Sequence, residues 1–408
     1  MAAEGKEHCA IRLPFLFDTR FELRRFQANR ASLSAATVRR RFADRGPVRF
    51  RDLLSYIVLF LAVVLIVATL LPFLRREEWW IRDLDFPRVQ IFTLGAVVVA
   101  AFPAVSDFDT WGEIALFAGL ILAMLYQGGR IFPYTRLASV QVLPARKQDP
   151  RSSISIVIAN VLMTNRESSR LVRIIEENDP EVVLLLEPDS RWEAEMRPIE
   201  VRYPKVVRRP LDNTYGMLLY SRLELVDPEI RYLIDPKIPS MHAGVRLGTG
   251  QLVRLHCVHP EPPSPTEASE STDRDAELIL VGKAVKERGE PAIVCGDLND
   301  VAWSMTTSLF QKVSGLLDPR KGRGMFSTFH AKYPLMRWPL DHVFVSEHFR
   351  FQDMRTLAAF GSDHFPVYAR LTFEPDGKAA HEKPKADAGD QELAHEKLEK
   401  AAKTDKPE

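Results

Sequence analysis

The sequence predicts a layered α/β domain, of mixed α/β (α+β) class, preceded by an α-helical transmembrane region. Long apolar runs crowd the stretch between residues 53 and 126. After residue 152, short runs rich in β-branched residues alternate with segments of helical periodicity, and strands mixed with helices pack as layers. Acid, amide and histidine side chains follow several of these predicted strands, which suggests where a functional site would form.

Three apolar stretches predict about three transmembrane helices within residues 51–130. Residues 53–74 are long enough to cross a hydrocarbon core, and residues 86–105 and 111–126 are shorter candidates that carry a few polar side chains. Aromatic residues lie near the span ends, where amphipathic rings suit the headgroup layer: Trp79, Trp80, Trp111 and Tyr126. A buried core helix is the alternative for each stretch, but the short polar connections leave little polar surface for a soluble domain.

The N-terminal residues 1–50 predict the topology of these spans. Residues 1–51 hold twelve Lys or Arg against five Asp or Glu, including Arg39, Arg40 and Arg41. The positive-inside rule therefore favours a cytoplasmic N-terminus, and three spans then place the rest of the chain outside the cytoplasm. The loop at 106–110 has two Asp and no basic residue, which is weaker counter-evidence because acidic residues contribute little to the rule. We expect a multi-pass membrane protein with its C-terminal domain outside the cytoplasm.

A polar stretch at residues 131–151 predicts the linker that leaves the membrane, and residues 152–374 predict a globular domain. Within it, residues 154–158 predict a strand, Ser168 the N-cap of a helix, and residues 182–186 a second strand. Further segments repeat this pattern: a helix at 276–288 closed by Gly289, and strands at 292–295, 216–220, 243–247 and 252–258. Residues 375–408 are charged and poor in apolar side chains, so we expect a disordered tail, with a helix at residues 392–403 as the less favoured alternative.

Charge and cysteine content bear on three questions: whether the substrate is a nucleic acid, whether a disulfide forms and whether zinc is bound. Net charge is +1 overall, and residues 151–374 hold 28 basic against 31 acidic residues. This balance weighs against a duplex nucleic acid as the main substrate, because such binders usually carry a basic surface. Of three cysteines, Cys257 and Cys295 lie on predicted strands that could be neighbours. Two buried free thiols are favoured over a disulfide, and zinc-type spacing is absent from the sequence.

The chemistry-bearing residues stand at the ends of predicted strands. Asp297 and Asn299 follow the run at 292–295, and Glu187 follows the run at 182–186. Asp363 and His364 follow Gly361 and Ser362. Carboxylate, amide and imidazole groups together suit a hard divalent cation and a phosphate ester. These residues predict a metal-dependent phosphoesterase.

An ordered series of short motifs resembles the endonuclease/exonuclease/phosphatase superfamily over about residues 152–373. The series comprises Asn160, Glu187, Tyr215 with Gly216, His259, the Gly-Asp-Leu-Asn motif at 296–299, Asp341 with His342, and the Ser-Asp-His motif at 362–364. The resemblance implies a four-layer α/β/β/α sandwich of the DNase I-like type with its site at the strand ends. The His-Pro and Pro-Pro pattern after His259, beside an N-terminal anchor, resembles the bacterial membrane-bound branch.

The resemblance also implies roles for the motif residues. Glu187 would be the principal Mg²⁺ ligand, with Asn160 and Asp363 beside the same metal, and Mn²⁺ is an alternative ion. Asp297 would orient or deprotonate the attacking water, and Asn299 would bind the phosphate. The remaining residues act around them: Asp341 would orient His364 on a phosphate oxygen, His259 would stabilise the leaving group, and Tyr215 would contact substrate.

Each of these residues also has an ordinary structural explanation. Glu187 could begin a solvated loop, Asp297 and Asn299 could be turn formers, and Asn160 could form an Asx-turn. The Asp363 and His364 pair could form a turn or a helix cap, and His259 could be a surface histidine. The ordered partners favour the functional explanation over these alternatives.

The expected substrate is a phosphate ester or diphosphate of a lipid or cell-envelope metabolite. The proline-rich stretch at 260–265 lacks the basic and aromatic residues of a nucleic-acid clamp. An enzyme tethered at the bilayer also meets phosphorylated lipids at high effective concentration. Two alternatives remain: an extracytoplasmic Mg²⁺-dependent nuclease, and a non-catalytic membrane receptor or scaffold on the same fold. The expected partners are the lipid bilayer and the phosphorylated substrate, and no protein partner can be inferred.

Overall fold

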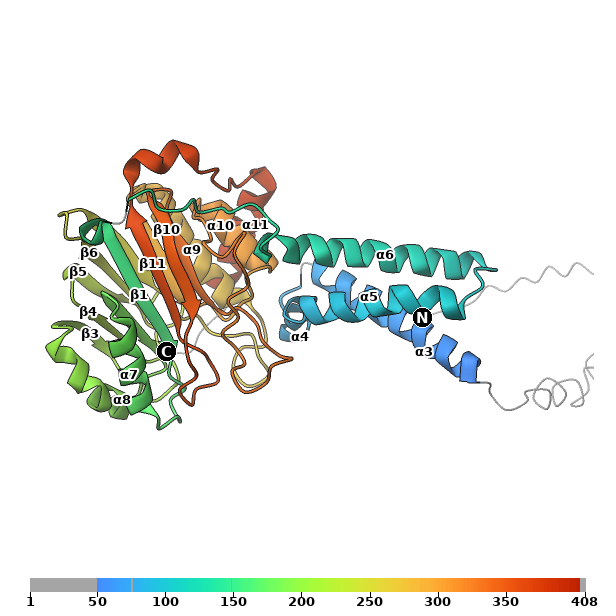
Figure 1. Cartoon of the computed structure of the whole chain (residues 1–408), viewed down its shortest axis with the longest axis horizontal. Helices are drawn as coiled ribbons and strands as arrows, with labels where there is room; N and C mark the ends of the chain where they lie inside the picture. Colours follow the sequence, from blue (N-terminus) through green and yellow to red (C-terminus); the bar gives the residue numbers. More distant parts are fainter. Residues whose placement is uncertain (1–49, 75, 148, 404–408) are drawn as a thin grey trace, which may run out of the picture. The chain divides into compact units, whose positions relative to one another are not determined.

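The computed structural model describes residues 50–74, 76–147 and 149–403. The predicted N-terminal segment 1–50 lies outside the described residues except for its last position. The contacts described below lie within residues 60–408, which form one compact unit. Figure 1 shows the labelled helices and strands.

Three helices are long and apolar enough to cross a membrane: α3 (Phe50–Leu70), α5 (Arg88–Val105) and α6 (Trp111–Ile131). Many of their large apolar side chains are exposed, as expected of lipid-facing surfaces, among them Phe60, Val67, Val97, Leu122 and Leu125. Short elements connect them: η1 (Leu71–Phe73), α4 (Trp79–Arg82), η2 (Asp83–Asp85) and, after α6, η3 (Phe132–Tyr134). The second span begins later than the sequence predicts, because Phe86 and Pro87 precede α5 and proline favours the start of a helix.

Two mixed β-sheets form the centre of the following domain. The first has the order β10-β11-β1-β2-β4-β3 and the second β5-β6-β7-β8-β9. The strands of the first are β1 (Ser153–Asn160), β2 (Val182–Leu186), β3 (Lys205–Arg209), β4 (Met217–Ser221), β10 (Phe349–Thr356) and β11 (Val367–Phe373). Those of the second are β5 (Glu224–Arg231), β6 (Ser240–Arg246), β7 (Leu252–Cys257), β8 (Ala292–Asp297) and β9 (Asp341–Val345).

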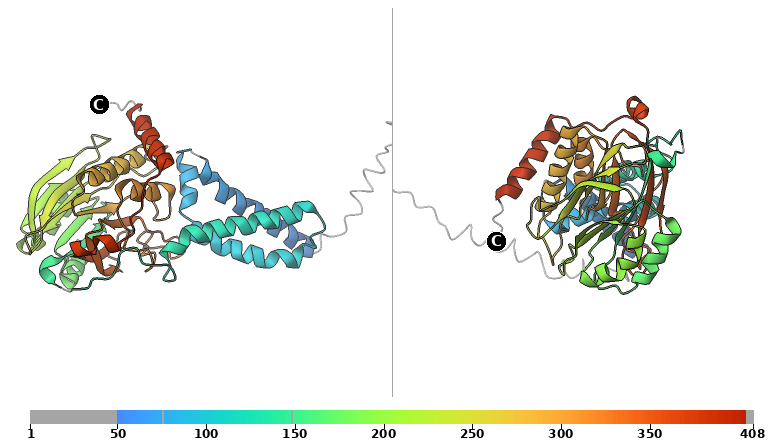
Figure 2. Two further views of the ribbon diagram at one scale, coloured as in Figure 1. Left: turned by 90° about the horizontal axis from the view of Figure 1, so that it is seen from above. Right: turned by 90° about the vertical axis from the view of Figure 1, so that its left-hand side faces the viewer.

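The two sheets pack face to face, with helices on their outer faces. Ile156 and Leu184 of the first sheet share the inter-sheet core with Leu255 and Ile293 of the second. Helices cover the outer faces: α7 (Ser168–Asn178) and α8 (Ser190–Met196) on the first sheet, α9 (Thr272–Arg288) and α10 (Met305–Ser314) on the second. Both views in Figure 2 keep these helix pairs on opposite sides of the sheets. The predicted four-layer α/β/β/α sandwich is confirmed.

Local structure follows the sequence pattern closely in several places. The strand predicted at 182–186 coincides with β2, and Gly289 closes α9 in the left-handed conformation at φ 62°. Helix α7 starts at Ser168, but its N-cap is Glu167, so the predicted cap is wrong by one residue. Cys257 lies opposite Cys295 across β7 and β8, and both are buried free thiols, as predicted.

The C-terminal segment differs from the sequence expectation. Instead of a disordered tail, it forms η6 (Pro375–Ala380) and α11 (Ala388–Lys403), up to the last described residue. Ala394 packs with Ile279 of α9 and Leu309 of α10, and Lys397 forms buried ion pairs with Glu77 and Asp275. The composition of the tail concealed this helix, because a narrow apolar stripe and a few ion pairs with distant residues hold it in place.

Candidate active site

Parallel pairing of β1 and β2 brings Asn160 and Glu187 together. Asn160 is the last residue of β1 and pairs with Leu186, so Glu187 follows directly at the same sheet edge. The Asn160 Nδ2 donates to Glu187 Oε1 at 2.7 Å. It also donates to Asp297 Oδ2 at 3.2 Å, across the gap to the second sheet. The Asn160 amide nitrogen therefore hydrogen-bonds to two carboxylates that were predicted at the ends of different strands, Glu187 and Asp297.

The second sheet contributes Asp297 and Asp341 from neighbouring strands. Asp297 ends β8 and lies opposite Asp341, which begins β9, because these strands are antiparallel. Just before Asp297, a Cβ on Gly296 would lie 1.9 Å from the Val258 carbonyl oxygen, and Gly296 has φ 142°. Only glycine allows this approach of β7 and β8, and the approach positions Asp297.

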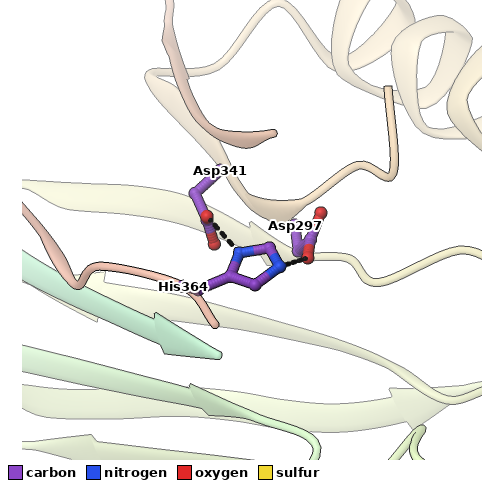
Figure 3. Close-up of side chains that lie close together, drawn as sticks. All are labelled: Asp297, Asp341 and His364. Carbon is purple, nitrogen blue, oxygen red and sulfur yellow. Dashed lines mark hydrogen bonds and ion pairs between the residues drawn. The ribbon is translucent and has the colours of Figure 1, made fainter. Parts of the chain in front are cut away.

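His364 lies between the two aspartates, as Figure 3 shows. Its Nδ1 bonds to Asp341 Oδ2 at 2.8 Å, and its Nε2 lies 3.5 Å from Asp297 Oδ2. Burial alone would lower the pKa of His364, but the Asp341 and Asp297 carboxylates outweigh it and raise the pKa to about 10. Although burial opposes it, the charges of His364 and His259 hold the pKa of Asp297 below its ordinary value. The shifts at His364 and Asp297 favour a protonated His364 beside an ionised Asp297, whereas burial raises the pKa of Asp341.

Two residues of the site have a left-handed backbone that side chains other than glycine seldom adopt. Glu187 has φ 61° and Asn299 has φ 49°. The Asn299 backbone N–H donates to Asp297 Oδ1 at 2.9 Å, so this conformation helps to hold the Asp297 carboxylate. Strained residues of this kind cluster at functional sites, where surrounding contacts hold them in place.

The other predicted residues reach the same region with less direct contacts. The Tyr215 hydroxyl donates to Glu267, and its ring lies 5.6 Å from the His259 ring. The Asn299 Nδ2 donates to the Pro260 carbonyl oxygen at 2.9 Å. The Asn299 Oδ1 takes no part in this hydrogen bond. Asp363 lines the cavity beside His364.

All of the predicted site residues except Asn160 and Asp341 line one cavity of about 730 Å³. Asn160 and Asp341 are buried behind it and bond to residues that line it. His342 is not in it, because its ring bonds to the Asp300 carbonyl and to Arg320 inside the second sheet's outer layer. The ionisable side chains of the cavity lining are Asp83, Glu187, Glu267, Asp297, Asp363, His259, His364 and Tyr215. No lysine or arginine is among the described residues that line it.

The donor set fits a divalent cation. Burial raises the pKa of Glu187, so ionised Glu187 needs positive charge nearby. Buried Asp341 Oδ1 and His259 Nδ1 have no hydrogen-bond partner among the described residues. Ligand atoms of Asp297, Asp341 and His364 lie within 4.8 Å of one another, but both His364 nitrogens already face carboxylates. Glu187, Asn160 and Asp363 are the better candidates for oxygen ligation.

Several residues that shape the site were not found from the sequence. Thr328 Oγ1 accepts from the backbone N–H of Asp341 at 3.2 Å and from that of Leu340 at 3.3 Å. Phe86 and Trp338 line the cavity although the sequence assigned Phe86 to a membrane span. Pro87 is the local signal that could have shown that α5 begins after Phe86. Nothing local marks Thr328 or Trp338.

Comparison with protein families gives one match. The profile of the Endonuclease/Exonuclease/phosphatase family matches residues 157–364, which is half of the chain. A comparison with curated protein sequences finds no match.

Comparison with solved structures finds similar chains of low sequence identity. D. rerio TDP2 in complex with a single strand DNA product is 19% identical, with TM-score 0.46, covering 54% of this chain and 99% of its own. A Beutenbergia cavernae endonuclease/exonuclease/phosphatase is 20% identical, with TM-score 0.45, covering 55% and 72%. A family protein from Bacteroides thetaiotaomicron is 18% identical, with TM-score 0.47, covering 56% and 100%.

Proposed function

Because this chain belongs to the endonuclease/exonuclease/phosphatase family, we propose that it is a membrane-anchored, metal-dependent phosphoesterase. The observation that carries this proposal is the acidic cavity with His364 held between Asp297 and Asp341. Among the described residues of this cavity lining there is no lysine or arginine, so an anionic phosphate needs a cation there.

Glu187, with Asn160 and Asp363, would hold Mg²⁺ or Mn²⁺ in this cavity. When bound, the ion supplies positive charge that neutralises the non-bridging phosphate oxygens. Asn160 then has a positioning role, because its amide orients the Glu187 and Asp297 carboxylates toward one point.

Side chains of this protein accept the proton from water and offset the negative charge that develops on the phosphate. Ionised Asp297 is the group that accepts a proton from the attacking water. The His364 imidazolium, oriented by Asp341, donates toward the phosphate and offsets charge that grows in the transition state. His259 lies at the cavity wall and is the candidate to stabilise the leaving group. Asn299 and Tyr215 are the candidates for contacts to the phosphate and the rest of the substrate.

The three apolar helices support an anchor in the membrane. With three crossings, the arginine-rich N-terminus favours a cytoplasmic start and an extracytoplasmic catalytic domain in a bacterial cell membrane. The substrate we propose is a phosphate ester or diphosphate of a lipid or cell-envelope metabolite, which the anchor keeps close to the enzyme.

The test is a substrate panel on the whole protein in detergent or nanodiscs. It includes p-nitrophenyl phosphate, bis(p-nitrophenyl) phosphate, polyprenyl diphosphate, phosphatidic acid, phosphatidylglycerol and single-stranded DNA, each with Mg²⁺, with Mn²⁺ and with EDTA. We expect metal-dependent hydrolysis of a lipid phosphate that is lost with EDTA and in the Glu187→Gln variant. Faster cleavage of DNA than of every lipid would instead establish the nuclease, and inactivity on all substrates would favour a receptor or scaffold.

A further inference from the structure

One side of the active-site cavity is apolar and comes from two distant segments. Phe86 and Pro87 precede α5, and Met336, Trp338 and Leu340 precede β9. The Phe86 and Trp338 rings pack edge to face with centroids 5.7 Å apart. Phosphate chemistry needs no such wall, so the wall points to an apolar part of the substrate beyond the phosphate.

The segment before β9, which supplies Met336, Trp338 and Leu340 to this wall, also exposes large apolar side chains on the protein surface. In the loop at residues 331–337, Tyr333 is 57% exposed, Leu335 85% and Met336 51%. The loop has a defined backbone, because the His330 N–H donates to the Met336 carbonyl and the Met336 N–H to the Tyr333 carbonyl, each at 2.9 Å. An ordered loop that presents a group of large apolar side chains usually marks a contact surface.

A contact with α5 sets the position of this loop. The Gln90 side chain, in the first turn of α5, donates to the Leu335 carbonyl at 2.7 Å. The exposed tip therefore lies level with the turn at which α5 would enter the hydrocarbon layer. Exposed Lys332 and Arg337 flank the tip, and such cations suit the anionic headgroups of a bilayer surface.

Met336 links the two surfaces, because it lines the cavity and is half exposed on the loop. A hydrocarbon chain could pass from the bilayer over Met336 to Trp338 and Phe86 while its phosphate reaches the Asp297 side. A nucleic acid fits less well, because the described cavity lining lacks the lysine and arginine that would follow its backbone.

We propose that the 331–337 loop inserts into the bilayer leaflet beside the catalytic domain, and that the apolar wall holds the hydrocarbon chain of a lipid phosphate ester. The lipid is then hydrolysed without leaving the membrane. This inference rests on the proposed phosphoesterase function and adds the class of substrate and its route to the site.

Insertion of the loop is tested without any measurement of activity. A Leu335→Cys variant in a Cys9→Ser background is labelled with bimane, since Cys257 and Cys295 are buried, and placed in nanodiscs that contain nitroxide lipids. We expect strong quenching by the nitroxide lipids and weak quenching by aqueous iodide. Val201→Cys, at a position 90% exposed in η5 (Arg197–Val201), is the control and should show the reverse. Equal behaviour of the two labels would overturn the insertion.

The substrate class is tested by the ratio of two activities. For Leu335→Asp we expect at least a ten-fold loss of kcat/KM on long-chain lipid phosphates in nanodiscs, because the charge keeps the loop out of the lipid. Activity on the soluble p-nitrophenyl ester that the wild type cleaves should stay within two-fold, since Leu335 does not line the cavity. Val201→Asp should change neither activity.

The outcomes separate this inference from the proposed function. Hydrolysis of soluble esters without hydrolysis of any lipid phosphate would overturn the inference and leave the phosphoesterase intact. Equal losses on both substrates in Leu335→Asp would also overturn it. Inactivity of the wild type on every substrate would contradict the proposed function, and bimane quenching would still decide whether the loop inserts.

Discussion

At the scale of single residues, the site is a buried group of opposite charges joined by short contacts. His364 touches a carboxylate through each ring nitrogen, and Asn160 touches a carboxylate on each sheet. Each carboxylate is thereby held in one orientation, and a site held in one orientation need not reorganise as charge develops during the reaction.

We predict that Asp297→Asn lowers kcat by about 10²- to 10⁴-fold, the range for loss of a general base. The side chain keeps its size, and the Asn299 N–H keeps an oxygen to bind, so the fold should be retained. Hydrolysis rates and a thermal melt of the purified variant check both parts.

Asp212→Asn is the matched control, because Asp212 is exposed and does not line the cavity. Its kcat should equal that of the wild type. A fully active Asp297→Asn variant would remove Asp297 from the mechanism.

At the scale of elements, the strand ends determine which side chains can meet. Parallel β1 and β2, and antiparallel β8 and β9, all present their polar residues at one edge of the sandwich. Strand β11 runs antiparallel to β1, so the Asp363 and His364 segment before β11 lies beside the end of β1.

We predict that Gly296→Ala destabilises the protein by more than about 3 kcal/mol, because the added Cβ would clash with the Val258 carbonyl and strain the backbone. Gly289→Ala is the control, since it has a positive φ with open space around it and should cost only roughly 1–2 kcal/mol. Thermal melts of the two variants measure the difference, and equal effects would contradict the proposed close approach.

A second prediction concerns the pair His242 and His256 on β6 and β7, whose Nδ1 atoms lie 2.7 Å apart. Burial lowers the pKa of His242 to about 3 and, with Arg288, that of His256 to about 4. The unfolded chain therefore binds more protons below pH 6.5, and stability falls as the pH drops from 6.5 toward these values. At pH 5 the loss is about 2 kcal/mol for each histidine.

Thermal melts at pH 7.5 and pH 5 check this prediction. His242→Gln with His256→Gln should lose less melting temperature between the two pH values than the wild type does. An equal loss in both proteins would show that other groups cause the acid sensitivity.

At the scale of the whole molecule, ion pairs join segments that are far apart in sequence. Lys397 of α11 contacts Glu77, between η1 and α4, at 2.8 Å and Asp275 of α9 at 2.6 Å. Lys400 also contacts Glu77, at 2.6 Å. Although burial opposes it, the charges of Lys397 and Arg274 hold the pKa of Asp275 below its ordinary value. These ion pairs join the C-terminal helix to the segment between η1 and α4 and to α9 of the outer helix layer.

We predict that Lys397→Ala destabilises the protein by about 1–3 kcal/mol, because it removes a cation shared by two buried carboxylates, while Glu77 keeps its contact with Lys400 and Asp275 keeps its contact with Arg274. The expected result is a lower melting temperature and faster proteolysis within α11. Lys403→Ala, at an exposed position of the same helix, should have little effect. Similar proteolysis of both variants would argue against the prediction that the Lys397 ion pairs hold α11 in place.

The apolar spans and the first strands of the domain were predictable from local periodicity in the sequence. The four layers were predictable only through the ordered series of motifs that resembles the family, and the same series supplied the candidate site residues. Glu187, for example, stands directly after the apolar run that forms β2, and Asp297 is the last residue of β8, two residues after its apolar run. The roles assigned to individual site residues stay predictions until the variants are measured.

Only the tertiary structure decided how those residues meet. Three sets of contacts join segments that are far apart in the chain. Asn160 bonds to both Glu187 and Asp297, Phe86 and Trp338 form one wall of the cavity, and α11 packs on α9. Local patterns do not encode such contacts, because they depend on sheet order and on charges supplied by distant elements. The sequence therefore shows which functional side chains the protein carries, and the tertiary structure determines which of them lie close together.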